Sequence, residues 1–458
     1  MKPMNIAFSR MAAMVLAAML VCANTAASLA QSSGPRIIRD AEIEGLMRLY
    51  TRPIFKAAGI NPKSVKVYLI ADPRINAFVA GGQRIFVHTG LITQSATPNE
   101  VIGVLAHETG HIAGGHLARM GVEVDHASVT SVIGMLVGVA AVAGGIAAGN
   151  SEAAKAGQGV MLGSQGLAQR NFFAYQRSME ASADQAALKY LAATGQSARG
   201  MIKLFEKLSQ QSIATLRNVD PYVLSHPMPL ERIRNLEKAA TASSGFDKID
   251  PPQLVLRHEL AQAKLMGFME SAQAVMRRYP ASDMSLPARY ARAIAMFRRG
   301  DITNAMPVID TLVKDLPQNP YFWELKGQAL LENGRAVEAV APLQQALQLL
   351  PRNGLIQLLL AQALIDTETK ANARTALRML HQAESSEGTM PAIFNYKARA
   401  YGLTGELGKA ELATAEAAML KGDKKLALDK AKLAQGRFKM GTPEWVRAND
   451  LVNFASRD

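Results

Sequence analysis

Apolar residues in the first half of this chain alternate between helical and extended spacing, which predicts a mixed region of helices and short strands. Residues 41–58 carry apolar side chains at helical spacing, so we expect an amphipathic helix there. Three short apolar runs predict strands, at residues 65–70, 75–80 and 84–88. Gly81 and Gly82 separate the last two runs and predict a hairpin turn. A further helix is predicted at residues 172–195, where a glycine ends the pattern.

A helix start is visible between the last strand and this later helix. Thr97 suits the N-cap, Pro98 suits the first helical position, and Glu100 would close a capping box. Apolar residues then recur at helical spacing, at Val101, Val104, Leu105 and Ile112. The pattern therefore predicts a helix through the segment that contains His107 and His111.

A long uncharged segment rich in glycine, alanine and valine follows at residues 132–148. Gly134 and Gly138 have the spacing that lets two helices pack closely. We expect residues 126–170 to form a small-residue hairpin that covers the site as a lid. A hairpin that touches a membrane and a true membrane span stay open as alternatives, although glycine and alanine contribute little to membrane insertion.

The second half changes to almost continuous helical pattern with an internal repeat. Pairs of residues recur 34 positions apart, namely Gly300 and Gly334, Ala305 and Ala339, and Pro317 and Pro351. Together with Trp323 and Gly327 they fit the tetratricopeptide pattern. The small residues allow paired helices to approach closely, and the proline ends the second helix of a pair. We expect residues 251–458 to form a solenoid of helix pairs.

The first thirty residues have the features of an export signal. Lys2 and Arg10 precede an apolar run, and Ser28-Leu29-Ala30 is acceptable for cleavage. The single cysteine, Cys22, lies inside this segment, so the mature chain would have no cysteine. That composition suits an oxidising compartment such as a bacterial periplasm, and it excludes thiolate metal ligands. We therefore expect a periplasmic protein whose signal peptide, residues 1–30, is cleaved near Ala30.

The net charge of +13 is spread along the chain without a block of like charges. Mixed-sign helix surfaces of this kind do not indicate nucleic-acid binding, and we expect none. An anionic membrane surface or an acidic partner protein fits the basic balance better.

The chemistry of the chain is indicated by the run His107-Glu108-Thr109-Gly110-His111. Two imidazoles four residues apart on a helix lie on one face and can reach one metal ion. Glu108 lies at the edge of that face, where it can serve as the general base in metal-assisted hydrolysis. The pattern favours zinc, although cobalt or manganese could occupy the same ligands.

A catalytic zinc ion usually takes three protein ligands, so a third must come from elsewhere in the chain. His116 would lie nearly opposite His107 if the helix continued, so we place it around the site or in the core. Glu180 on the later helix is the better candidate for the third ligand. Asp184, one turn further on, could orient a histidine ligand through its free ring nitrogen.

These motifs together resemble one peptidase family. The histidine pair with His116, then Glu180 and Asp184, then Ser225-His226-Pro227 with Arg232 are similar to the family of CAAX-prenyl endopeptidases and HtpX-type heat-shock proteases. Asn76-Ala77-Phe78 also resembles the sheet that precedes the zinc helix in that family. The export signal and the tetratricopeptide pattern are similar to its periplasmic branch.

The resemblance implies an α+β, mostly helical fold. It consists of a compact zincin-type metallopeptidase domain with a small β-sheet at residues 31–245, followed by an all-α tetratricopeptide solenoid at 251–458. The family's one zinc ion per chain would be held by His107, His111 and Glu180, with Glu108 as base. By the same resemblance His226 and Arg232 would stabilise the oxyanion, or His226 would instead close onto the zinc and hold the enzyme inactive.

The leading hypothesis is a periplasmic zinc metalloendopeptidase for envelope and outer-membrane protein quality control. Its substrates would be unfolded or misassembled envelope proteins that add as a strand beside Asn76, Ala77 and Phe78. The solenoid would bind the outer-membrane assembly machinery, and peripheral membrane contact is an additional expectation. One alternative is a tetratricopeptide chaperone or adaptor with a mostly latent protease domain. Another is a membrane-embedded protease, which would rest on residues 132–148 alone.

Overall fold

The computed structural model describes residues 36–116, 175–214, 222, 226, 230–243 and 245–456. The predicted signal peptide at 1–30 and the predicted lid at 126–170 lie outside these residues. The chain divides into a small unit, Met1–Ile38, and a large unit, Arg39–Asp458. A two-residue strand, β1 (Ile37–Ile38), is described in the small unit. The elements below belong to the large unit.

Helix α2 (Ala41–Ala57) opens the large unit, as its apolar spacing predicts. The carboxylate of Asp40 accepts a hydrogen bond from the backbone N–H of Ile43 at 2.9 Å, which satisfies one of the free donors at the helix start. Ile43, Met47 and Ile54 on the apolar face are completely buried. Burial of this face fixes α2 against its neighbours in the core.

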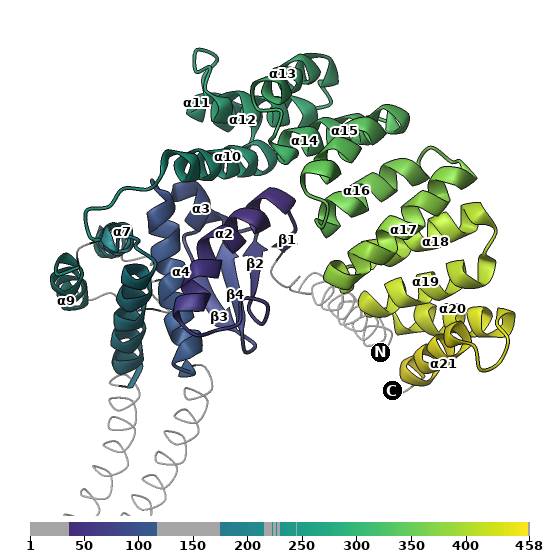
Figure 1. Cartoon of the computed structure of the whole chain (residues 1–458), viewed down its shortest axis with the longest axis horizontal. Coiled ribbons are helices and arrows are strands. Elements are labelled where there is room, and N and C mark those ends of the chain that lie inside the picture. Colours follow the sequence, from purple (N-terminus) through teal and green to yellow (C-terminus); the bar gives the residue numbers. More distant parts are fainter. Residues whose placement is uncertain are drawn as a thin grey trace, which may run out of the picture. The chain divides into compact units, whose positions relative to one another are not determined.

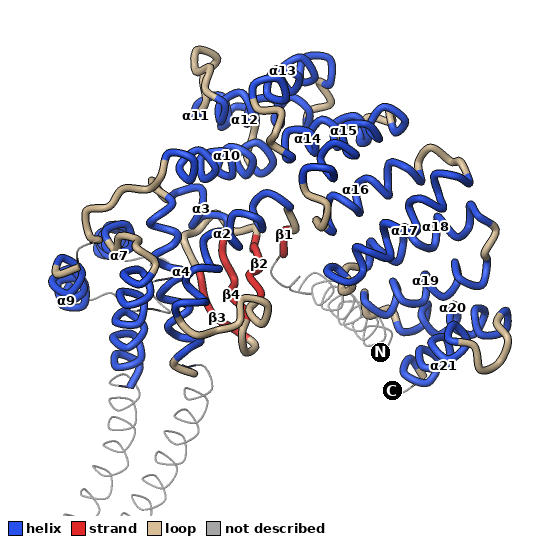
Figure 2. The backbone as a smooth tube through the Cα atoms, in the orientation of Figure 1, coloured by secondary structure: helices blue, strands red, loops and turns tan. Residues whose placement is uncertain are grey.

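Strands β2 (Lys66–Ile70), β3 (Ala77–Ala80) and β4 (Arg84–His88) follow and lie in the order β2-β4-β3 (Figure 2). β4 pairs parallel with β2 and antiparallel with β3. Gly81 and Gly82 have φ angles of 58° and 91°, which glycine adopts without strain, and they close the predicted hairpin. The hairpin prediction is confirmed, and β3 is left at the edge of the sheet.

Helix α3 (Thr89–Gln94) leads into α4 (Pro98–Ala113), the helix that carries the histidine pair. The predicted capping box is wrong, because the Thr97 side chain makes no capping hydrogen bond. Glu100 accepts a hydrogen bond from the backbone N–H of Ala96 at 2.9 Å instead. The N–H of Asn99 donates to Asp250, 151 residues further along the chain, at 3.0 Å. The start of α4 is therefore completed by a tertiary contact that no local pattern contains.

Two helices pack tightly against α4, one at residues 175–193 and the other α7 (Arg199–Ala214). Glycines in α4 permit this approach. A Cβ atom at Gly103 would lie 2.4 Å from Cβ of Met201, and one at Gly110 would lie 2.8 Å from the carbonyl oxygen of Ala183. Helix α9 (Leu230–Thr241) packs on α7. Any larger residue at these glycines would push the helices apart.

Beyond α9 the described chain consists of helices connected by short turns (Figure 1). They are α10 (Pro252–Met269), α11 (Ala272–Arg278), α12 (Leu286–Arg298), α13 (Ile302–Asp315), α14 (Pro320–Glu332), α15 (Ala336–Leu349), α16 (Gly354–Ile365), α17 (Lys370–Glu387), α18 (Pro391–Thr404), α19 (Leu407–Leu420), α20 (Lys424–Arg437) and α21 (Pro443–Ala455). The mostly helical α+β fold class predicted from the sequence is confirmed. None of the helices that the structure describes has the length and apolar character needed to cross a bilayer.

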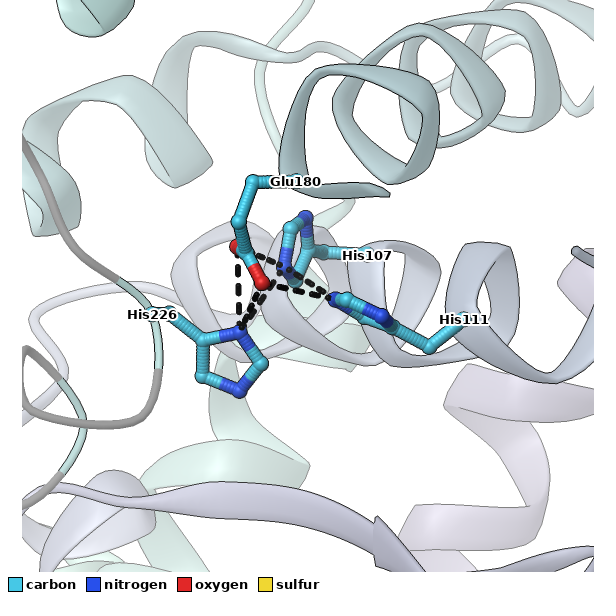
Figure 3. Close-up of side chains that lie close together, drawn as sticks. All are labelled: His107, His111, Glu180 and His226. Carbon is cyan, nitrogen blue, oxygen red and sulfur yellow. Dashed lines mark hydrogen bonds and ion pairs between the residues drawn. The ribbon is translucent and has the colours of Figure 1, made fainter. Parts of the chain in front are cut away.

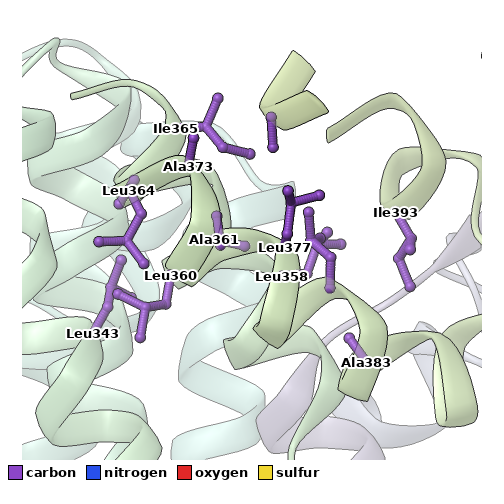
Figure 4. Close-up of a cluster of buried hydrophobic side chains, with 14 of the residues drawn as sticks. Leu343, Leu358, Leu360, Ala361, Leu364, Ile365, Ala373, Leu377, Ala383 and Ile393 are labelled. Carbon is purple, nitrogen blue, oxygen red and sulfur yellow. The ribbon is translucent and has the colours of Figure 1, made fainter. Parts of the chain in front are cut away.

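The 34-residue spacing corresponds to one pair of helices and its turn. A Cβ atom at Gly327 in α14 would lie 2.3 Å from Cγ of Leu343 in α15, so the glycine allows the two helices of this pair to meet. Gly334, between them, has a φ angle of 76°. Leucine, isoleucine and alanine side chains from α14 to α19 form a shared core, part of which is shown in Figure 4. Each pair thus completes its core with its neighbours, as in solenoids.

A buried group of charges connects α2 with the helical region. Nζ of Lys264 in α10 lies 2.8 Å from Asp40, 3.5 Å from Glu42 and 3.5 Å from Glu324 in α14. Tyr290 donates a hydrogen bond to Glu42 at 2.8 Å. Burial raises the pKa of Glu324 to about 7, against the opposing charge of Lys264. One ammonium group therefore holds three carboxylates from two parts of the chain.

Replacing Lys264 with methionine should lower the free energy of unfolding by about 3–5 kcal/mol, because the three carboxylates would lose their buried cation. Urea denaturation of the two proteins measures the difference. Lys326→Met serves as a control, since Lys326 pairs with the half-exposed Asp310 and should cost less than about 1 kcal/mol. Equal effects of the two substitutions would contradict the central role of Lys264.

Candidate metal centre

The two histidines of α4 point their Nε2 atoms at one place. His107 is completely buried, and its Nε2 lies 3.1 Å from Nε2 of His111. This is the one-face geometry expected of histidines four residues apart on a helix.

Glu180 reaches the same place from the helix at 175–193. Its Oε2 lies 3.3 Å from Nε2 of His107, and its Oε1 lies 3.5 Å from Nε2 of His111. The contact depends on the close packing of this helix on α4 at Gly110. Two segments more than sixty residues apart thus supply three converging donor atoms.

His226 supplies a fourth donor atom (Figure 3). Its Nδ1 lies 3.0 Å from Oε1 of Glu180 and 3.5 Å from Nε2 of His107. We call these residues the four-ligand cluster: His107, His111, Glu180 and His226. Their donor atoms all lie within 4.8 Å of one another.

This spacing fits a metal ion. Four ligands bound tetrahedrally at zinc-like bond lengths lie about 3.3 Å from one another. Five of the six donor pairs lie 3.0 to 3.5 Å apart when the nearer Glu180 oxygen is taken for each pair, and all four donor atoms lie within 4.8 Å of one another. Imidazole nitrogens and a carboxylate oxygen are also the donor types that zinc takes in proteins. The residues present can therefore hold such an ion.

The outward-facing groups of the cluster have partners of their own. Nδ1 of His107 lies 3.0 Å from Oδ1 of Asp184. Arg232 donates two hydrogen bonds to Asp184, at 2.7 and 2.8 Å, and its Nη1 lies 2.9 Å from Glu180. The guanidinium group is thus directed at the two carboxylates. Contacts of this kind orient metal ligands and fix the tautomer of a ligating histidine.

His116 lies beside His111, which is one of the two positions, around the site or in the core, that the sequence argument allowed. That argument continued the helix and placed His116 nearly opposite His107. Helix α4 instead ends at Ala113, and Gly115 adopts a φ angle of 62°. The turn brings Nδ1 of His116 to 3.0 Å from Nδ1 of His111.

Glu108 lies next to the cluster without belonging to it. It is 1% exposed, and neither of its carboxylate oxygens accepts a hydrogen bond from the described part of the chain. Its Oε1 lies 3.5 Å from Nε2 of His226. Burial raises the pKa of Glu108 above its usual range. A buried carboxylate with unused lone pairs beside such a cluster is suited to accept a proton.

Comparison with known proteins identifies the family of this chain. Residues 40–240 match peptidase family M48. The metalloprotease LoiP of Escherichia coli is 32% identical over 209 residues, which cover 45% of this chain and 74% of LoiP. This chain belongs to peptidase family M48. It is a metallopeptidase.

Longer relatives extend beyond the M48 region. The β-barrel assembly-enhancing protease of Yersinia pestis is 23% identical over 419 residues, covering 89% of this chain and 83% of that protein. The protein of the same name from Escherichia coli is 23% identical over 371 residues, covering 75% and 72%. These matches include helical residues outside the M48 region.

The charged groups of the four-ligand cluster shift one another's pKa values. Burial would lower the pKa of His107, but its contacts with Asp184 and Glu180 outweigh burial and raise this pKa to about 9. Burial and the charge of His107 lower the pKa of His111 to about 2. Burial would raise the pKa of Glu180, but its contacts with His107 and His226 lower it strongly. The carboxylates thus favour positive charge at the point where the donor atoms meet.

Two aromatic side chains pack against histidines of the four-ligand cluster, and neither was predicted from the sequence. The ring of Tyr222 lies 4.7 Å from that of His226, whose backbone N–H donates to the Tyr222 carbonyl at 2.7 Å. The ring of Phe205 lies edge-on to His107 at 5.9 Å, and Arg232 lies over it. Tyr222 could have been suspected from its place four residues before His226, whereas nothing in the sequence indicates Phe205.

Along β3, at the edge of the sheet, the backbone N–H and C=O groups point alternately toward β4 and away from it. The N–H of His88 donates to the carbonyl of Asn76 at 2.9 Å, so in the antiparallel register Asn76 and Phe78 direct their backbone groups at β4. The backbone groups of Ala77 and Val79 consequently face away from β4. The Phe78 ring stacks on Phe86 at 5.2 Å.

Replacing Asp184 with asparagine should weaken zinc binding by about 10–100-fold, because His107 and Arg232 would lose their shared carboxylate. Competition with a chelating dye measures the affinity, and circular dichroism checks the fold. Asp247→Asn, at an exposed ion pair with Arg199, should leave the affinity unchanged. Unchanged affinity in Asp184→Asn would contradict the orienting role.

Proposed function

We propose that this M48 metallopeptidase is a zinc-dependent endopeptidase of the bacterial periplasm that cleaves misfolded or stalled envelope proteins. The observation that carries the proposal is the four-ligand cluster with Glu108 beside it. Metal-assisted peptide hydrolysis requires a metal site and a general base beside it. The donor spacing suits the metal, and the buried Glu108 carboxylate, which accepts no hydrogen bond from the described residues, suits the base.

The metal would be one zinc ion per chain, held by His107, His111 and Glu180. The nitrogen and oxygen donors of the four-ligand cluster, and their near-tetrahedral spacing, support zinc over ions that prefer six oxygen ligands. When bound, zinc supplies Lewis-acid polarisation of the scissile carbonyl and acidifies the attacking water. Asp184 and Arg232 would keep the donor atoms aligned from behind, with His116 doing the same for His111.

Glu108 would act as the general base and then as the general acid. It takes the proton from the attacking water and passes it to the leaving amine. Its raised pKa supports this exchange, since a carboxylate returns a proton readily only when its pKa approaches the working pH.

His226 would hold the site closed in the conformation described here. Its Nδ1 contacts Glu180 and His107 at 3.0 and 3.5 Å, where a substrate carbonyl would have to enter. For cleavage, His226 must leave this position. Once displaced, it could stabilise the oxyanion together with Arg232, which is the second role that the family resemblance implies.

The substrate would bind as an additional strand at the edge of β3, the strand that begins after Asn76 and contains Phe78. The outward-facing backbone groups of Ala77 and Val79 support this, because a peptide there would complete their hydrogen bonds. Recognition through backbone groups suits unfolded proteins of many sequences.

The N-terminal export pattern supports a periplasmic location with cleavage near Ala30. The relatives named β-barrel assembly-enhancing protease support a role in envelope protein assembly and quality control. We propose that residues 251–458 form a tetratricopeptide domain that binds the outer-membrane assembly machinery. The segment 132–148 would add peripheral membrane contact.

A second candidate function is a chaperone or adaptor whose protease domain is mostly latent. The position of His226 favours it, because a fourth protein ligand leaves no open coordination position for substrate.

Degradation of casein and of an unfolded outer-membrane protein by the mature chain tests the function, with bound zinc measured alongside. Glu108→Gln should lose activity by about 10²–10⁴-fold and keep its zinc, because it removes the base and no ligand. His226→Ala should raise activity, because it opens the fourth position.

Glu237→Gln, an exposed carboxylate on α9, is the matched control and should behave as wild type. Loss of activity in His226→Ala with zinc retained would assign that residue to the oxyanion. Bound zinc without cleavage by either wild type or His226→Ala would refute the peptidase proposal in favour of the chaperone.

The substrate edge is tested by Val79→Pro. Proline removes an outward-facing N–H and spares the bonds to β4, so cleavage of unfolded substrate should fall while zinc stays bound. Val79→Ala keeps the N–H and should retain most of the activity. Full activity in Val79→Pro would contradict strand addition at this edge.

A further inference from the structure

A cleft of about 590 Å³ lies between α2 and the start of β2 on one side and the end of α17 on the other. It shares no residue with the four-ligand cluster or with β3. Six basic residues line it: Arg39 and five others that we call the cationic row, namely Arg48, Arg52, Lys56, Lys63 and Lys66.

Three residues of the cationic row belong to α2. Arg48, Arg52 and Lys56 follow one another at intervals of four residues, so they lie on one face of the helix. They span about 12 Å along its axis. Lys63 and Lys66 continue the row after the helix ends.

Few carboxylates neutralise this row. The two acidic residues of the cleft are both engaged by Arg39, which lies 2.7 Å from Glu44 and 2.5 Å from Glu387. Arg48 reaches Glu44 only at 3.7 Å, with 62% of its side chain exposed. In the regions that the structure describes, Arg52 and the three lysines make no ion pair. The cleft is therefore a concentration of unneutralised positive charge.

The wall of the cleft is also partly apolar. Val67 and Tyr68 of β2 line it and are only partly buried, and the Tyr68 ring is held by stacking on Phe86 at 5.3 Å. Ser386, at the end of α17, and Thr389, just after it, add hydroxyl groups opposite. A ligand there meets a line of charge beside partly apolar walls.

We propose that this cleft binds an acidic polypeptide segment in extended conformation. The charges are distributed along a line, which matches carboxylates spaced along a peptide and does not match one phosphate group, which needs donors converging on a point. The partly apolar walls would contact the side chains between the acidic ones, and the cleft would add a binding site remote from the site of cleavage. This binding does not require the proposed proteolysis.

The test measures fluorescence anisotropy of a labelled peptide of alternating glutamate and valine, about eight residues long so that it spans the row when extended. The full mature chain carrying Glu108→Gln is used, so that the peptide stays intact. The triple variant Arg52→Gln, Lys56→Gln, Lys63→Gln should bind at least about tenfold more weakly. Raising NaCl from about 0.05 to 0.3 M should also weaken binding.

A matched control removes three exposed lysines at or beside α20, through Lys421→Gln, Lys425→Gln and Lys432→Gln. It should bind the peptide as the parent does. No binding by the parent, equal loss in both triple variants, or equal affinity for the same peptide with glutamine in place of glutamate would overturn the proposal. Binding to vesicles containing phosphatidylglycerol that is lost in the first triple variant, without peptide binding, would assign the cleft to a membrane surface instead.

Discussion

Three imidazole nitrogens and one carboxylate oxygen lie within 4.8 Å of one another, and much of the M48 region is organised around keeping them there. Nitrogen lone pairs at 3.1 Å repel one another unless a proton or a cation lies between them. Asp184, Arg232 and His116 fix the outward sides of three of the four ligands, His107, Glu180 and His111. The arrangement therefore makes physical sense as a preformed cation site, since pairing and hydrogen bonding are what make buried charge tolerable.

Helix packing supplies the precision that the site needs. Gly103 and Gly110 let α7 and the helix at 175–193 approach α4 closely, and the second contact is what brings Glu180 to the histidine pair. The start of α4 is completed by Asp250, which immediately precedes the helical region. Lys264 extends this coupling, because it holds carboxylates from α2 and α14 together. The metal centre and the helical region are thus connected by buried polar contacts as well as by apolar packing.

Periodic patterns could be predicted well from the sequence, and single tertiary contacts could not. The helix with the histidine pair, the hairpin at Gly81 and the helical second half all follow from spacing and turn residues. The capping box at Thr97 was predicted wrongly, because the N–H of Asn99 donates to the distant carboxylate of Asp250. His116 lies next to His111 and not opposite His107, because helix α4 ends at Ala113 and Gly115 has a φ angle of 62°. Phe205 and the cationic row were missed because both acquire meaning only when separate elements meet.

We propose that His226 completes a closed metal site with three imidazoles and one carboxylate. X-ray absorption spectroscopy of zinc-loaded Glu108→Gln, compared with the same protein carrying His226→Phe, tests it most directly. The account predicts three imidazole ligands in the first protein and two in the second, with zinc bound in both. The same number of imidazoles in both proteins, or no zinc bound in the first, would contradict it.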